Sequence, residues 1–211
     1  MIYTDGIIFD LDGTLWDSVR TGFSAWHIKL KEIGIQADFS YEAFKACYGL
    51  PMNLFFDRLL PGKIIENQDQ IMKNILDYEN IYLREHGGIL YPQVEETLQE
   101  LQKKFPLTIV SNCQVGYIEA FLFAHKLEKY FCDTLSYGDN GLMKDENIAL
   151  MAKRNGFLHP VYVGDIQADA DSTHKAGLPF IHAAYGFGKV KDAEERIENF
   201  SQLLQVLKEV E

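Results

Sequence analysis

The chain has 211 residues, of which 47% are hydrophobic and 24% charged, and its formal net charge is −11 at pH 7. This length allows one full domain with a smaller insertion. The acidic balance argues against nucleic acid or an anionic membrane surface as a partner. No stretch is apolar enough to cross a membrane. Residues 1–4 lead directly into the first expected strand and leave no room for a signal peptide, and three widely spaced cysteines do not suggest disulfides. We therefore expect a cytoplasmic protein.

The first expected element is a buried strand that ends in two carboxylates, within the sequence IIFDLDGTL at residues 7–15. A short apolar run between two glycines is typical of a strand. Residues two apart point the same way in an extended chain, so Asp10 and Asp12 should lie on one side. At ~4 Å such a pair repels by about 1 kcal/mol in water and by about 4 kcal/mol at an effective dielectric near 20. A bound cation or a catalytic proton therefore explains the pair better than a solvated acidic loop.

Residues 16–90 are expected to form an all-helical block. Apolar residues at helical spacing predict a helix from Val19 to Ile33 that ends at Gly34. Further helices are expected over 41–46, 53–60 and 64–84, with turns at 48–51 and 61–62. No segment between Trp16 and His86 resembles a strand, and Gly87-Gly88 closes the block.

From Pro92 onward the pattern alternates between helix and strand. Strands are expected over 107–110, 131–135, 161–163 and 180–183, and helices over 92–105, 115–129, 145–155 and 169–176. A last helix is expected to carry Ile197, Phe200, Leu204 and Leu207 on one face. Such alternation predicts a parallel sheet with helices on both faces. We expect an α/β fold: a doubly wound, Rossmann-like core of residues 1–15 and 91–211 with an inserted all-helical cap of residues 16–90.

Polar residues follow the expected strands at the edge where open parallel sheets bind ligands. They are Asp10, Asp12, Ser111, Asn112, Asp165 and Asp169. Lys144, after the glycine-bearing loop 137–141, can add an ammonium group. Carboxylates suit Mg²⁺, and a metal, a lysine and backbone N–H groups can neutralise a phosphoryl group. Each residue alone also fits a plain loop, surface or helix-start position; their shared edge favours a phosphoryl site.

These residues resemble the four motifs of the haloacid dehalogenase-like (HAD) phosphohydrolase superfamily. Residues 10–14 (DLDGT) resemble its first motif, 110–112 (VSN) its second, Lys144 its third-motif lysine, and 164–169 (GDIQAD) its fourth. The helical block is similar to the cap of the phosphoglycolate-phosphatase-like branch. Residues 16–18 (WDS) and 91–92 (YP) resemble the two ends of that cap.

The resemblance implies a Mg²⁺-dependent phosphohydrolase that cleaves a small-molecule phosphate monoester through an aspartyl-phosphate. Asp10 would be the nucleophile, and Asp12 the general acid and then the general base. Mg²⁺ would bind the Asp10 carboxylate, the Asp12 backbone carbonyl and Asp165. Asp169 would be a further ligand, or would hold Lys144 or a metal-bound water.

The same resemblance implies a substrate-binding set. Ser111, the backbone N–H of Asn112, and Lys144 would hold phosphate oxygens, while Thr14 would steady the first-motif loop. The expected partner is a small phosphorylated metabolite. Trp16, Tyr48 and Arg58 are candidate substrate contacts from the cap. The loop at 185–188 either closes near the site or forms a plain turn.

Two other functions stay open. A sugar-phosphate mutase of the same fold also keeps both aspartates, whereas dehalogenases and phosphonate hydrolases lack the acid equivalent to Asp12. A non-catalytic domain that senses phosphate or metal would be expected to have lost Asp10 or Asp12, and both are present. The substrate and the oligomeric state do not follow from the sequence.

Overall fold

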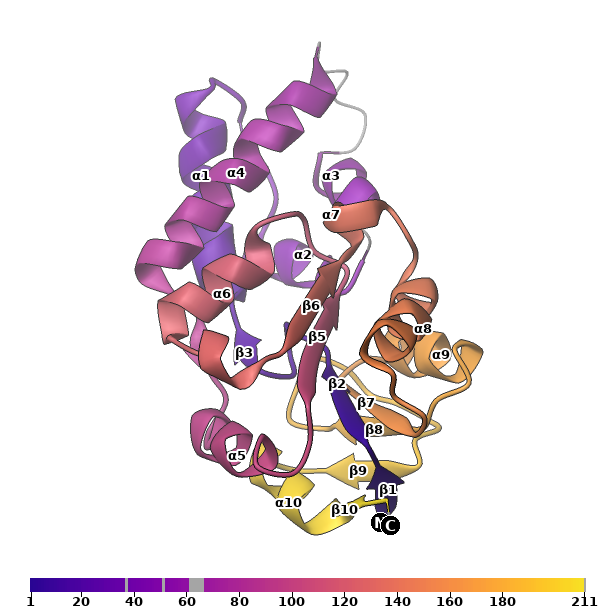
Figure 1. Ribbon diagram of the computed structural model, residues 1–211. Helices are drawn as coiled ribbons and strands as arrows, with labels where there is room; N and C mark the ends of the chain where they lie inside the picture. Colours follow the sequence, from indigo (N-terminus) through magenta and orange to yellow (C-terminus); the bar gives the residue numbers. More distant parts are fainter. Residues whose placement is uncertain (37, 51, 61–66, 211) are drawn as a thin grey trace.

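A six-stranded parallel sheet lies at the centre of the computed structural model, which describes residues 1–36, 38–50, 52–60 and 67–210 (Figure 1). The strands lie in the order β6-β5-β2-β7-β8-β9. In that order they span Asp133–Ser136, Leu107–Ser111, Gly6–Phe9, Pro160–Gly164, Phe180–Ala183 and Glu195–Ile197. Ile7 in β2 is aligned with Leu107 on one side and Val161 on the other. The expected parallel α/β fold is confirmed, with the strand that leads to Asp10 in the middle.

Alternate residues of β2 face two different layers of helices. Ile7 and Phe9 belong to a buried cluster with α5 (Val94–Leu101), α6 (Tyr117–His125) and the C-terminal segment. Ile8 belongs to a second cluster with α8 (Lys144–Asn155) and α9 (Gln167–Lys175). Both faces of the sheet are therefore covered, which is why its strands are apolar runs rather than alternating ones.

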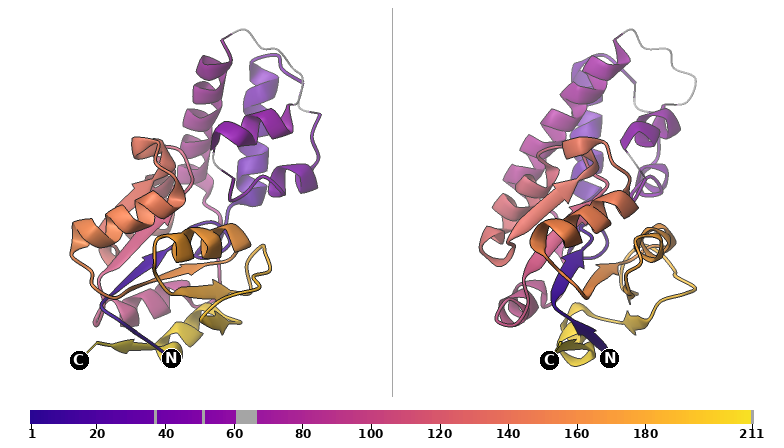
Figure 2. Two further views of the ribbon diagram at one scale, coloured as in Figure 1. Left: turned by 90° about the vertical axis from the view of Figure 1, so that its right-hand side faces the viewer. Right: turned by 45° about the vertical axis from the view of Figure 1, so that its right-hand side comes forward.

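A helical insertion lies between β2 and β5 and stands above the carboxyl ends of the strands (Figure 2). Its helices are α1 (Val19–Glu32), α2 (Tyr41–Lys45), α3 (Met52–Leu59) and α4 (Gln68–His86). They have a buried cluster of their own, which includes Trp26, Phe44 and Ile75. Within the described residues, no helix combines the length and apolarity needed to cross a membrane.

The two connections of the insertion form a short antiparallel pair. β3 (Trp16–Asp17) leaves the sheet domain and β4 (Ile89–Leu90) returns to it, with Trp16 opposite Leu90. The expectation of no strand between Trp16 and His86 is therefore wrong. Two paired residues carry no periodic signal, so this strand is set by the tertiary contact alone.

Several expected elements have different bounds. The expected helix 115–129 is α6 followed by a 3₁₀ turn at Glu128–Tyr130, and the loop 137–141 contains a helical turn, α7 (Tyr137–Asn140). Of the expected turns, Pro51 and residues 61–62 lie outside the described residues, as does the expected helix start at 64–66.

The expected last helix is wrong. Ile197 ends strand β9, a 3₁₀ turn covers Phe200–Gln202, and only α10 (Leu203–Val206) is helical before β10 (Leu207–Glu209). β10 pairs in parallel with β1 (Ile2–Thr4), so the two ends of the chain meet below the main sheet (Figures 1 and 2). These pairings join residues far apart in the chain and override the helical spacing of the apolar side chains.

Candidate active site

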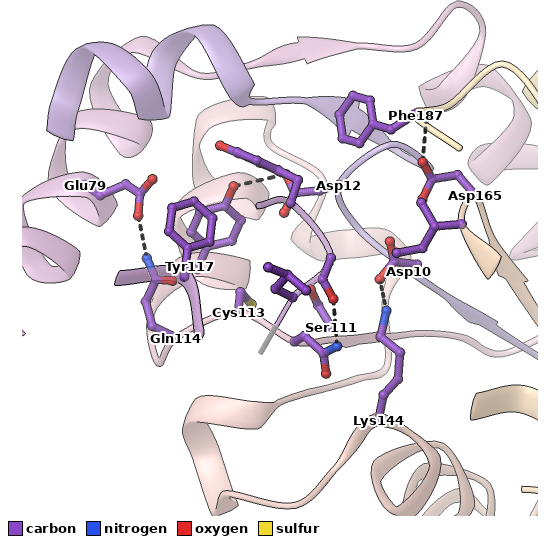
Figure 3. Close-up of a pocket in the computed structure, with 16 residues that line it drawn as sticks. Asp10, Asp12, Glu79, Ser111, Cys113, Gln114, Tyr117, Lys144, Asp165 and Phe187 are labelled. Carbon is purple, nitrogen blue, oxygen red and sulfur yellow. Dashed lines mark hydrogen bonds and ion pairs between the residues drawn. The ribbon is translucent and has the colours of Figure 1, made fainter. Parts of the chain in front are cut away.

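A cavity of about 40 Å³ lies where the ends of β2, β5 and β7 face the insertion (Figure 3). Six of the predicted site residues line it: Asp10, Asp12, Ser111, Asn112, Lys144 and Asp165. Asp169 lies behind them in contact with Lys144. Thr14 does not line the cavity. Its hydroxyl is buried with no hydrogen-bond partner among the described residues, and its backbone carbonyl accepts from the Tyr185 hydroxyl at 2.8 Å.

Lys144 joins two carboxylates at the base of the cavity. It is the first residue of α8 and is buried, and its Nζ lies 2.6 Å from both Asp10 Oδ1 and Asp169 Oδ1. Burial raises the pKa of Asp10 to about 7, against the opposing effect of the ammonium group. Burial alone would lower the pKa of Lys144, but the two carboxylates outweigh it and raise that pKa well above its usual value. Lys144 is therefore charged at neutral pH.

Asp10, Asp165 and Asp169 form a buried carboxylate cluster in which one oxygen from each lies within 4.8 Å of the others. Asp169 Oδ2 accepts from the backbone N–H groups of Asp165 and Ile166, at 3.1 and 3.2 Å. Burial, followed by the charges of Asp169 and Asp10, raises the pKa of Asp165 well above its usual value. Three carboxylates against one ammonium leave an excess of negative charge that is unfavourable in a buried place. A hard divalent cation such as Mg²⁺ fits this set of oxygen donors.

The side chain of Asp12 points away from this cluster, toward the insertion (Figure 3). Its Oδ1 accepts from Ser18 Oγ at 2.5 Å and from the Tyr117 hydroxyl at 3.0 Å. Burial raises the pKa of Asp12 to about 7. Gly13 allows the turn that follows Asp12, because its φ is +84° and a Cβ there would lie 2.1 Å from Asp165 Oδ2. Asp10 and Asp12 thus face different sides of one cavity.

The insertion touches the sheet domain across the cavity. Asn112 Nδ2 donates to the Gly49 carbonyl at 3.2 Å, and Gly49 packs against Ile166 so closely that a Cβ would lie 2.4 Å from Ile166 Cδ1. From the opposite side, the Phe187 N–H donates to Asp165 Oδ2 at 2.6 Å, and the Phe187 ring contacts Tyr48. The loop at 185–188 therefore reaches the site. The insertion and the sheet domain therefore contact each other across the cavity.

Three residues that sequence reasoning missed also line the cavity: Glu79, Gln114 and Tyr117. Glu79 lies four residues from Ile75 and from Leu83 on the buried face of α4. An acidic residue among the apolar positions of a helix indicates a buried carboxyl group, and this pattern is visible in the sequence. Of the cap candidates named from sequence, Tyr48 lines the cavity, while Trp16 and Arg58 do not.

Comparisons with known proteins identify the family of the chain. A family model described as haloacid dehalogenase-like hydrolase matches residues 7–183. The phosphoglycolate phosphatase of Escherichia coli K12 is 28% identical over 207 residues, covering 86% of this chain and 82% of the relative. That of Aliivibrio fischeri is 28% identical over 224 residues, covering 95% of each.

Solved structures agree on the fold. A haloacid dehalogenase-like hydrolase from Bacteroides fragilis has a TM-score of 0.81 at 22% identity, over 95% of this chain and 99% of the other. A CbbY variant from Rhodobacter sphaeroides in complex with xylulose 1,5-bisphosphate has a TM-score of 0.79 at 17% identity, over 95% and 96%. At these identities the likeness concerns the fold alone.

The fold that the chain shares with these solved structures is a parallel α/β sheet with a helical insertion over its strand ends. The chain belongs to the haloacid dehalogenase-like hydrolase family. With relatives named as phosphatases, the expectation of a phosphatase of this superfamily is confirmed.

Proposed function

We propose that this protein is a Mg²⁺-dependent phosphohydrolase that cleaves a small phosphate monoester through an aspartyl-phosphate on Asp10. The observation that carries the proposal is the arrangement of Asp10 against Lys144 and the buried cluster, with Asp12 on the other side of the same cavity. The phosphatase names of the relatives support it.

The residues present fit a magnesium ion. The carboxylates of Asp10 and Asp165 and the backbone carbonyl of Asp12 would hold it, with Asp169 as a further ligand or as the support of Lys144. When bound, Mg²⁺ would neutralise the charge of the phosphoryl group during transfer.

In the first step, a carboxylate oxygen of Asp10 attacks phosphorus, and the bond between phosphorus and the ester oxygen breaks. Asp12 in its carboxylic acid form gives its proton to the leaving oxygen, which departs as an alcohol. A pKa of about 7 makes this form available near neutral pH. Lys144, Ser111 and the backbone N–H of Asn112 hold the phosphoryl oxygens in place.

In the second step, the Asp12 carboxylate takes a proton from a water molecule whose oxygen attacks the phosphorus of the aspartyl-phosphate. The bond between phosphorus and Asp10 breaks. The products are inorganic phosphate, the free Asp10 carboxylate and protonated Asp12, so the starting state of the enzyme is restored.

Residues 16–90 act in this proposal as a cap over a core of residues 1–15 and 91–211. A cavity of about 40 Å³ holds only a small ligand, so the cap must open to admit substrate and release product. Closure would exclude water during the first step. The β3–β4 pair, with Gly87 and Gly88 beside it, is the proposed hinge. We also propose a cytoplasmic location, because Cys47, Cys113 and Cys132 are free thiols.

The test is phosphate release from a panel of phosphate monoesters. Activity should require Mg²⁺, stop in excess chelator and return when Mg²⁺ is added. Asp10→Asn should abolish turnover, because an amide cannot form the acyl-phosphate, whereas Asp171→Asn, an exposed change of the same charge on α9, should not. Acid-quenched wild-type protein should carry a phosphoryl group on the Asp10 peptide.

Full activity in chelator would disprove the metal assignment. Near-wild-type turnover by Asp10→Asn would disprove the covalent mechanism. Transfer of the phosphoryl group to a sugar hydroxyl instead of water would favour the mutase alternative.

A further inference from the structure

The side of the cavity opposite Lys144 is formed by Glu79 and Gln114 (Figure 3). Both side chains are more than nine-tenths buried, with exposed fractions of 3% and 7%. Gln114 Nε2 donates to Glu79 Oε2 and to Asn80 Oδ1, at 3.0 Å each. Helix α1 packs tightly on this wall, because a Cβ at Gly22 would lie 2.8 Å from Glu79 Oε1. The position of the wall is therefore well fixed.

The hydrogen bonds also fix which way the Gln114 amide points. Asn80 Nδ2 donates to the Val115 carbonyl at 2.8 Å, so Asn80 presents its oxygen to Gln114. Turning the Gln114 amide over would place its oxygen against two acceptors, the Asn80 oxygen and the Glu79 carboxylate. In the observed orientation, Gln114 Oε1 is buried and has no hydrogen-bond donor among the described residues. A buried acceptor without a donor is unfavourable, so binding of a ligand that donates a hydrogen bond to this oxygen would be favoured.

Positive charge is confined to the other side of the cavity. Among the described residues that line it, Lys144 is the only cation, and it already contacts Asp10 and Asp169. Lys45 lies over the Phe187 ring, 5.2 Å from its centroid, and does not line the cavity. The Tyr117 hydroxyl donates its hydrogen bond to Asp12. On the side of Glu79 and Gln114, the part of a substrate beyond the phosphoryl group therefore meets an unpaired amide oxygen and a carboxyl group, with no cation among the described lining residues.

We propose that the wall formed by Glu79 and Gln114 selects phosphate esters whose leaving group is a short uncharged alcohol with a second hydroxyl, and rejects leaving groups that carry a carboxylate. This inference rests on the proposed function and names its substrate class. A hydroxyl can donate to Gln114 Oε1 or to Glu79, whereas a carboxylate offers only acceptors and repels Glu79. The substrate named for the phosphoglycolate phosphatase relatives carries such a carboxylate, so this chain should differ from them.

The test compares 2-hydroxyethyl phosphate with 2-phosphoglycolate, which share a two-carbon skeleton and differ only in a terminal hydroxymethyl or carboxylate. At pH 8, where Glu79 is charged, the wild-type enzyme should favour the hydroxyl ester by at least about tenfold in kcat/KM. Glu79→Gln keeps an acceptor for Gln114 and removes the charge, so it should narrow this ratio to about threefold or less, mainly through better use of phosphoglycolate. Glu85→Gln, an exposed change of the same charge on α4, should leave the ratio unchanged.

Ethyl phosphate, which has neither distal group, distinguishes failure of this inference from failure of the proposed function. If it and phosphoglycolate are hydrolysed at least as well as 2-hydroxyethyl phosphate, the inference fails and the proposed function stands. If none of the three is hydrolysed with Mg²⁺, the inference fails, and the proposed function fails as well if no other monoester of the panel is hydrolysed. A folded Glu79→Gln enzyme with an unchanged ratio would also overturn the inference. If that variant does not fold, the kcat/KM ratio of the wild-type enzyme for the two esters tests the inference by itself.

Discussion

Burial of Glu79 on helix α4 raises its pKa from 4.5 to about 7. The folded protein therefore binds a proton at Glu79 in a pH range where the unfolded chain has released it. For such an acid, the free energy of unfolding is highest below pH 4.5 and falls as the pH rises toward 7. Above pH 7 the carboxylate is charged in both states, and the full penalty of its burial remains.

Replacement of Glu79 by Gln should remove this pH dependence. The difference in unfolding free energy between Glu79→Gln and wild type should increase by about 3 kcal/mol in favour of the variant as the pH rises from 4.5 to 7, because the amide is never charged. Urea unfolding in chelator at pH 5 and pH 8 measures the gain. Glu85→Gln, which is exposed, should show no such trend. An equal difference at both pH values would mean that Glu79 is not buried as described.

Sequence reasoning reached the strand-end residues but not this wall. Asp10, Asp12 and Asp165 follow apolar runs, so their approach to one edge follows from the parallel sheet alone. Glu79 and Gln114 meet because α4 of the insertion packs beside the segment after β5, a contact between residues 35 apart. No local pattern encodes that packing. Thr14 was expected near the substrate, and the turn at Gly13 instead directs its hydroxyl into the protein interior.

Among the structural elements, the turn after α2 brings the insertion into the site. Gly49 has φ of +85° and touches Ile166, whereas Gly34 has φ of +74° and nothing within 4 Å of a built Cβ. Comparing substitutions at the two glycines therefore distinguishes the effect of backbone strain from the effect of the contact across the cavity. Both should lose about 1–2 kcal/mol of stability when replaced by Ala, because L-residues disfavour this conformation.

Only Gly49→Ala should impair catalysis. The added methyl group pushes the insertion away from Ile166 and hinders closure, so kcat/KM should fall roughly three- to tenfold. Gly34→Ala should keep wild-type kinetics despite its lower melting temperature. Steady-state kinetics and thermal unfolding of the two variants make the comparison. If both variants lost activity equally, contact at Gly49 would have no role in closure.

Elements were predictable where local pattern and tertiary structure agree. Strands β2, β5, β6, β7 and β8 of the central sheet and the helices α1 and α8 are such cases, because each buries the residues that its pattern marks as apolar. The segment at residues 197–207 was not predictable in this way. Ile197, Phe200 and Leu204 have helical spacing, yet pairing with Ala183 draws Ile197 into an edge strand of the sheet. Hydrogen bonds to a strand already in place outweigh a weak local preference.

For the molecule as a whole, the crowded carboxylates at the sheet edge should make stability depend on the metal. At Mg²⁺ one hundred times above its Kd, binding adds about 2.7 kcal/mol, which for a chain of this size is a rise of about 5–10 °C in Tm. Asp165→Asn should lose most of this rise. It should also melt higher than wild type in chelator, because it relieves repulsion from Asp10 and Asp169.

Asp171→Asn serves as the control, since Asp171 is exposed on the neighbouring helix α9. It should show the full Mg²⁺ effect. Differential scanning calorimetry of wild type, Asp165→Asn and Asp171→Asn, each with Mg²⁺ and with chelator, measures the six Tm values. A wild-type Tm that does not respond to Mg²⁺ would contradict a metal site in the cluster.

The parallel pairing of β1 with β10 has a practical consequence for work with this protein. Both ends of the chain lie on the side of the molecule away from the cavity and the insertion (Figure 2). A purification tag, a fluorescent fusion partner or a surface anchor attached next to β1 or β10 should therefore lie away from the cavity and from the proposed cap. We expect immobilisation or labelling next to these two strands to leave the helices above the site unobstructed.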